Sequence, residues 1–135
     1  MTMKTILTLG AVALTLIGCS GKEDIVNVSK RELPPQTTAL SDADVEKMIV
    51  QAAAQRRWVC GHLKTNSLVC TQDRRNIHLK VRVDYTKTDF SVTQISENTE
   101  DLHKKIVHRH NVWVKKLEKT IMDLFIKQNL KNVRK

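Results

Sequence analysis

The sequence is poor in aromatic residues, proline and glycine, and its longest apolar run is shorter than a membrane span. Aromatic residues make up 4% of the 135 residues, and there are two prolines and four glycines. So few rings leave little on which nucleic-acid bases could stack, which disfavours a nucleic-acid-binding protein. The longest apolar run, residues 6–17, would be about 18 Å long as a helix, whereas a membrane span needs roughly 20 residues.

The usual sequence patterns of catalysis are also missing. No glycine-rich phosphate loop occurs, and no serine stands in the pattern of a nucleophile elbow. The few cysteines are better explained by lipidation and pairing than by nucleophilic chemistry. The sequence therefore favours a binding protein over an enzyme, and it predicts neither a cofactor nor a metal site.

The N-terminus has the layout of an export signal. Lys4 precedes the apolar run, which ends in the residues Leu-Ile-Gly-Cys at positions 16–19. This ending resembles the bacterial lipobox, which implies cleavage before Cys19 and acylation of Cys19. Ser20 in place of an aspartate resembles lipoproteins that are sorted to the outer membrane. An ordinary signal peptide and an uncleaved anchor are the alternatives.

The rest of the chain is long enough for one domain. We expect a signal peptide over residues 1–18, a lipidated tether over 19–40, an α+β domain over 41–131 and a basic tail over 132–135. The tether assignment rests on clustered charges, the pair Pro34-Pro35 and few large apolar residues.

Two cysteines remain once Cys19 is assigned to lipid. Cys60 and Cys70 would be exported to an oxidising compartment, so we expect them to form a disulfide. A metal site that combines them with His62 and His78 is the alternative, but its spacing fits no compact zinc pattern.

The hydrophobic periodicity predicts a helix, four strands and a second helix. Ser41 is a candidate N-cap for a first helix that ends near residues 56–57. Alternation is clearest over Ile77–Tyr85, where every second residue is apolar. The expected architecture is an α+β layer in which both helices pack on one face of a four-stranded antiparallel sheet. The expected strands are residues 58–63, 68–71, 77–85 and 90–95, and the last helix is 102–130.

Three residues of the last helix have specific expectations. Trp113 lies on the apolar stripe and is predicted to be buried. His110, on the same stripe, is predicted to be a core histidine bonded to a neighbour, and Asn111 is predicted to bond the end of the sheet.

Two segments resemble a group of small proteobacterial lipoproteins. These are AAAQRRW at residues 52–58 and NVWVKKL at residues 111–117, the second of which contains an N-x-W-x-x-x-L pattern. The resemblance spans about residues 42–121 together with the lipobox. It implies a fold and an envelope location rather than an activity.

Positive charge is concentrated at the C-terminal end. Residues 19–102 contain 12 Lys/Arg and 12 Asp/Glu, whereas residues 103–135 contain 10 Lys/Arg and only two acids. Such a helix face attracts phosphates and anionic headgroups. A purely solvated face and a nucleic-acid surface are the alternatives. The candidate anion-binding residues are Lys104, Lys105, Arg109, Lys115, Lys116 and Lys119.

Together these features predict a lipid-anchored envelope protein that faces the periplasm and acts by binding. An anionic envelope polymer, a lipid or a periplasmic protein would be its partner. The alternative function is inhibition of a cell-wall hydrolase, for which the turn at residues 64–67 is the candidate loop.

Overall fold

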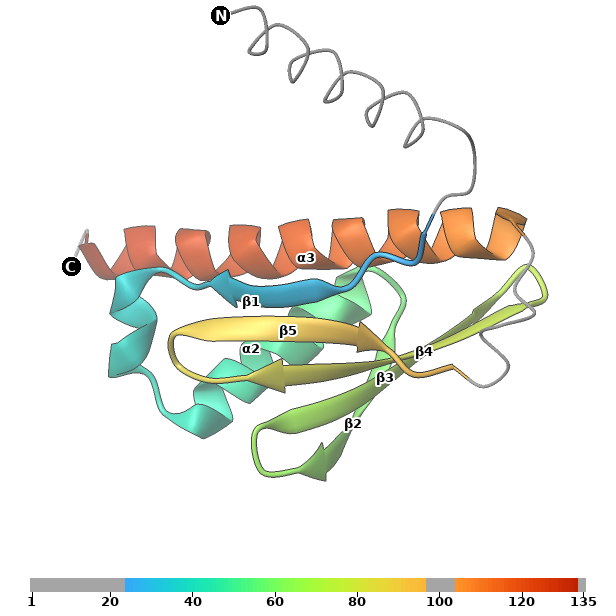
Figure 1. The fold of residues 1–135 in the computed structure, drawn as a ribbon. Helices are drawn as coiled ribbons and strands as arrows, with labels where there is room; N and C mark the ends of the chain where they lie inside the picture. Colours follow the sequence, from blue (N-terminus) through green and yellow to red (C-terminus); the bar gives the residue numbers. More distant parts are fainter. Residues whose placement is uncertain (1–23, 97–103, 134–135) are drawn as a thin grey trace, which may run out of the picture.

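The computed structural model describes residues 24–96 and 104–133. Cys19 and the predicted signal peptide lie outside the described residues. In chain order, the elements are β1 (Val28–Glu32), the 3₁₀ helix η1 (Pro35–Ala39), α2 (Asp42–Gln55), β2 (Val59–Lys64), β3 (Ser67–Arg74), β4 (Ile77–Tyr85), β5 (Asp89–Gln94) and α3 (Lys104–Val133). Figure 1 shows α3 running along one side of the sheet next to β1.

The sheet is antiparallel throughout, with strand order β1-β5-β4-β3-β2. The α+β class, the antiparallel sheet and the long C-terminal helix are confirmed. The prediction of four strands is wrong, because the sheet has five. The additional strand, β1, pairs with β5 and comes from within the segment predicted to be a tether.

Two features of β1 explain why the sequence does not predict this strand. Of its five residues only Val28 is buried, so no apolar alternation marks it. Its register with β5 shifts between Val28 and Arg31, and Lys30 between them has a φ of 45°. Such an edge strand cannot be identified from its own composition, because it is defined by its pairing with β5.

Local signals explain the predicted elements. The Ser41 hydroxyl accepts a hydrogen bond from the Asp44 N–H at 3.1 Å, so Ser41 caps α2 as expected. In β4 the residues that point to one face are buried, and they alternate with more exposed residues. The buried ones are Leu79, Val81, Val83 and Tyr85.

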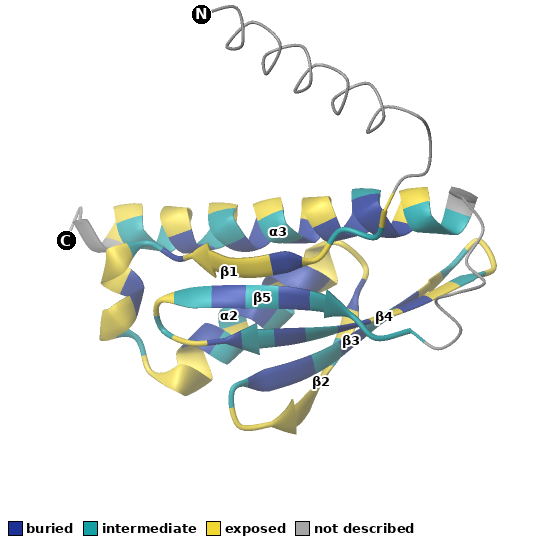
Figure 2. Ribbon diagram, in the orientation of Figure 1, coloured by how far each residue is buried: buried dark blue, intermediate teal, exposed yellow. Residues whose placement is uncertain are grey.

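One hydrophobic core joins the two helices to one face of the sheet. Its buried residues include Ile49 from α2, Phe90 from β5 and Leu117 from α3. Figure 2 shows the buried residues of α3 on the side of the helix that faces the sheet. Trp113 belongs to this core with 7% of its surface exposed, as the sequence predicts.

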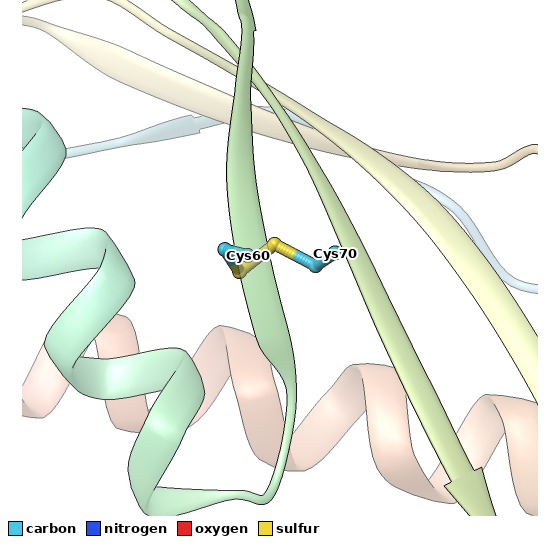
Figure 3. Close-up of a disulfide and its surroundings, with 2 residues drawn as sticks. All are labelled: Cys60 and Cys70. Carbon is cyan, nitrogen blue, oxygen red and sulfur yellow. A yellow bond between two sulfur atoms is a disulfide. The ribbon is translucent and has the colours of Figure 1, made fainter.

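The predicted disulfide between Cys60 and Cys70 is present. The two residues are directly opposite each other on β2 and β3, so the bond links the edge strand β2 covalently to β3 (Figure 3). Because each sulfur is bonded to the other, neither is a thiolate ligand for the alternative metal site.

The chain before β1 is bound to α3 through two polar side chains. The Asn111 amide accepts a hydrogen bond from the Val26 N–H at 2.8 Å and donates one to the Asp24 carbonyl, also at 2.8 Å. His110 Nε2 lies 3.3 Å from the Val26 carbonyl oxygen. His110 is fully buried and bonded to a neighbour, as predicted, and Asn111 bonds the chain that leads into the sheet.

The buried His110 predicts a stability that falls in mild acid. Burial lowers the pKa of His110 from its ordinary 6.5, against a smaller opposite effect of the hydrogen bond with Val26. Below pH 6.5 the imidazole of His110 therefore binds a proton in the unfolded chain but not in the folded chain. Because the unfolded state binds more protons, the free energy of unfolding decreases as the pH falls. The loss is at most about 1.4 kcal/mol per pH unit.

Urea denaturation at pH 7.5 and pH 5.5 measures this loss. The difference between the wild type and His110→Gln isolates the contribution of His110, and we expect the pH dependence to be weaker in the variant. Equal pH dependence in the two proteins would contradict the burial of a neutral imidazole.

Candidate functional site

A cleft lined by positive charge lies where three elements meet. It is formed by the C-terminal end of α2, the end of β3 with its following turn, and the first half of α3, and its volume is about 330 Å³. Six of its ten lining residues are lysine or arginine, and none is acidic. We call this the basic cleft. It is lined by Gln55, Arg56, Arg57, Gln72, Arg74, Arg75, Arg109, Val112, Trp113 and Lys116.

The wall from α3 follows from helical spacing. Arg109, Trp113 and Lys116 are separated by four and three residues, which places them on one face at about 100° per residue. Trp113 fixes this face against the core, so the two flanking cations are held at the cleft.

The wall from α2 is built from its C-terminal cap. The N–H of Arg57 donates to the Ala54 carbonyl and the N–H of Trp58 to the Ala53 carbonyl, which is the bonding of a Schellman motif. Arg57 has a φ of 68°, a left-handed conformation in which glycine is usual. Arg56 Nε donates to the Thr120 hydroxyl at 2.7 Å and so joins the end of α2 to α3.

The third wall is the turn between β3 and β4. Arg75 and Asn76, with φ angles of 55° and 62°, form a two-residue turn of the type that favours asparagine and glycine. A residue with a side chain costs about 1–2 kcal/mol in the left-handed region. Two arginines of the cleft, Arg57 and Arg75, thus occupy backbone positions that are unfavourable for arginine.

The charges of the cleft are not neutralised internally. Within residues 24–96 and 104–133, no ion pair joins a carboxylate to Arg57, Arg74, Arg75, Arg109 or Lys116. Loss of water contact and the positive charges of three neighbouring arginines lower the pKa of Arg74. These neighbours are Arg57, Arg75 and Arg109. Bringing like charges together without a counter-charge is unfavourable, and a bound anion would remove this cost.

The lining also contains two buried side chains, those of Trp113 and Gln72. The guanidinium carbon of Arg74 lies 5.7 Å from the centroid of the Trp113 ring, a cation–π contact. Gln72 has only 2% of its surface exposed. Neither its amide nitrogen nor its amide oxygen has a hydrogen-bond partner in the described part of the chain.

The structure divides the predicted anion-binding residues. Arg109 and Lys116 line the basic cleft. Lys115 lies on the other flank of α3, beside Arg31 and Glu118, and Lys119 forms an ion pair with Asp123 at 2.8 Å. The side chains of Lys104 and Lys105 lie outside the described residues.

The sequence prediction missed the contributions of α2 and β3. Two Arg-Arg pairs, at residues 56–57 and 74–75, are a usable signal in the sequence. In each pair the second arginine stands where a helix or strand ends, a position at which glycine or asparagine is more usual. Gln72 also has a signal, since it continues the inward phase of Leu68 and Cys70 along β3.

The turn that would serve a hydrolase inhibitor is short. Thr65 and Asn66 connect β2 to β3, and the Asn66 side chain donates to the Tyr85 carbonyl at 2.9 Å. Inhibition of a cell-wall hydrolase remains a prediction from the sequence.

No known family model, curated protein or solved structure matches this chain. In the described residues, no three His, Cys, Asp or Glu side chains are grouped as metal ligands. No helix in that same part of the chain combines the length and apolar character that crossing a membrane requires. The guanidinium, ammonium and amide groups of the cleft can hold an anion through charge-assisted hydrogen bonds.

Proposed function

We propose that this protein is a lipid-anchored bacterial envelope protein that binds a phosphate-bearing component of the envelope in the basic cleft. One observation carries the proposal, namely six cationic side chains around one cleft with no acidic residue among them. Five of the six are arginines, whose planar guanidinium groups match the oxygens of phosphate and carboxylate in two-point contacts. The number of charges favours phosphate, because a phosphate monoester carries nearly two negative charges near pH 7.

The expected location supports an envelope ligand. The lipobox-like residues 16–19, together with the resemblance of residues 52–58 and 111–117 to small envelope lipoproteins, support an anchor at Cys19 and a domain that faces the periplasm. A disulfide is typical of proteins in that compartment. Because Asn111 binds the carbonyl of Asp24, the connection from Cys19 to the fold is five residues, or at most about 18 Å. Such a short connection keeps the basic cleft near the membrane surface.

Calorimetric titration of the mature protein in detergent tests the ligand. Inorganic phosphate is the first probe, and the salt concentration is varied. We expect saturable binding whose affinity falls as salt is raised, since the attraction between cations and phosphate is screened. Absence of saturable binding at low salt would refute the proposed function.

Labelling with palmitate tests the anchor separately. We expect the label to enter the wild type and not Cys19→Ala, and we expect the variant to leave the membrane fraction. Unchanged fractionation of an unlabelled wild type would refute the anchor without affecting phosphate binding.

The left-handed backbone conformation of Arg57 allows an effect on stability to be separated from an effect on phosphate binding. Arg57→Gly relieves an unfavourable backbone position, so we expect the free energy of unfolding to rise by about 0.5–1 kcal/mol. The same change removes a cation from the basic cleft, so phosphate affinity should fall several-fold. Thermal melting and calorimetry measure the two effects.

Asn76→Gly is the matched control for this substitution. Asn76 has a φ of 62° and follows Arg75 in its turn, but it does not line the cleft. We expect a smaller change in stability, because asparagine already tolerates the left-handed region, and unchanged phosphate affinity. Weaker binding by Asn76→Gly would show that turn conformation, rather than charge, governs the cleft.

A further inference from the structure

We infer that the ligand of the basic cleft is a phosphorylated sugar, whose phosphate is held by the arginines and whose neighbouring hydroxyl is recognised by the amide of Gln72. This inference rests on the proposed function and specifies the ligand of the same site. It starts from Gln72, a buried side chain of the lining that has no hydrogen-bond partner among the described residues.

Gln72 is the described lining residue of the cleft whose buried side chain has polar atoms without hydrogen-bond partners. Its side chain is 2% exposed, lines the cleft, and leaves both the donor Nε2 and the acceptor Oε1 without partners in the described part of the chain. A buried amide without partners is unfavourable, and such groups in native proteins call for an explanation. A ligand that fills the cleft can supply both partners.

The two unpartnered atoms of Gln72 call for a ligand that both accepts and donates hydrogen bonds. The dianion of a phosphate monoester only accepts hydrogen bonds, so its phosphoryl oxygens cannot satisfy the acceptor Oε1. A hydroxyl both donates and accepts, so a ligand with a hydroxyl beside its phosphate can satisfy the whole amide. Sugars and related polyols carry hydroxyls in this relation to a phosphate ester.

The dimensions agree with a ligand larger than an ion. The cleft volume of about 330 Å³ falls at the lower end of the range of small-molecule sites, about 300–1,000 Å³. Nucleic acid fits less well, because Trp113 has only 7% of its surface exposed and cannot offer a free ring face to a base.

Access to Gln72 points to movement of Arg74. The two residues are two apart on β3, so their side chains leave the same face of the sheet. The amide atoms of Gln72 are closed to water, and the Arg74 guanidinium lies over the Trp113 ring, 5.7 Å from its centroid. A ligand therefore reaches the amide only after neighbouring side chains move, and we expect Arg74, which also lines the cleft, to move when a phosphate binds.

Calorimetry with three soluble probes tests this assignment. We expect the mature protein in detergent to bind glucose 1-phosphate at least about tenfold more tightly than inorganic phosphate, and glucose not measurably. A tenfold difference corresponds to about 1.4 kcal/mol. Equal affinities for glucose 1-phosphate and phosphate would overturn the sugar assignment while leaving the proposed function intact. If neither probe bound, both would fall.

Gln72→Leu identifies the residue responsible. We expect this variant to lose the preference for glucose 1-phosphate, to retain its affinity for inorganic phosphate, and to melt no lower than the wild type, since an unpaired buried amide has been removed. Gln51→Leu is the matched control, because Gln51 is exposed on α2 and does not line the cleft. A preserved preference in Gln72→Leu would overturn the role of the amide.

Reconstituted vesicles distinguish a free from a lipid-linked sugar phosphate. The anchored protein is placed in phosphatidylcholine vesicles with or without monophosphorylated lipid A, and glucose 1-phosphate is titrated. Competition by the glycolipid assigns the site to a membrane-linked sugar phosphate, and no competition assigns it to a soluble one. Equal competition by phosphatidylglycerol, which has no phosphorylated sugar, would overturn the inference.

Discussion

Replacing both Arg109 and Lys116 by glutamate is expected to weaken phosphate binding at least about 100-fold, or roughly 2.7 kcal/mol. Both side chains line the basic cleft from one face of α3. Each substitution removes an attraction and introduces a repulsion of similar size. Because both positions are exposed, the fold should tolerate the change, and calorimetry on the folded variant measures the loss.

The same helix supplies the control. Lys115→Glu with Lys119→Glu changes the net charge by the same amount, but these lysines are on the opposite flank of α3, where Lys119 already pairs with Asp123. We expect the control variant to bind phosphate within a few-fold of the wild type. Equal losses in the two variants would mean that the helix attracts anions diffusely and that the cleft has no special role.

Trp113→Ala is expected to have the largest effect on stability. The side chain is 7% exposed and belongs to the core that joins α3 to the sheet. Removing a buried tryptophan costs about 3–5 kcal/mol, because apolar contacts are lost and a cavity remains. For a domain of this size the melting temperature should fall by roughly 12–20 °C.

Trp113→Phe keeps the measurement useful if the alanine variant does not fold. Phenylalanine retains an apolar ring in the core, so the loss should be less than half of that in Trp113→Ala. A melting temperature unchanged by both substitutions would contradict the burial of Trp113 and, with it, the position of α3 against the cleft.

Local patterns in the sequence predict most of the secondary structure. The cap at Ser41, the alternation through β4 and the apolar stripe of α3 each depend on neighbours within one element. The facing positions of Cys60 and Cys70 follow from the short turn between β2 and β3. β1 could not be predicted in this way, since its pairing with β5 is fixed by residues more than fifty positions away.

The basic cleft is a tertiary feature, and the charge pattern predicts only part of it. Arg109 and Lys116 stand out because they lie in the basic C-terminal region. The other four cations come from residues 56–57 and 74–75, in a stretch whose charges balance overall. Only folding places them beside α3, so a count of charge along the chain finds one wall of the cleft and misses two.

The two walls that the charge pattern misses each contain an arginine in the left-handed backbone region, Arg57 and Arg75. Glycine at position 57, or asparagine or glycine at position 75, would fit the backbone better than the arginine that is present. Residues kept in unfavourable conformations are concentrated at functional sites. Among the described residues, three that are neither glycine nor asparagine have a positive φ, and two of them, Arg57 and Arg75, deliver a guanidinium to the same cleft. The third, Lys30, lies at the register shift of β1.

An NMR titration with inorganic phosphate, followed at the side-chain Nε–Hε signals of the arginines, tests the basic cleft most directly. The predicted result is a saturable shift of the signals from Arg57, Arg74, Arg75 and Arg109. Arg31 and Arg82, which are paired with Glu118 and Asp84, should remain unshifted. Shifts of equal size at all six of these arginines, or at none of them, would contradict a phosphate site in the cleft.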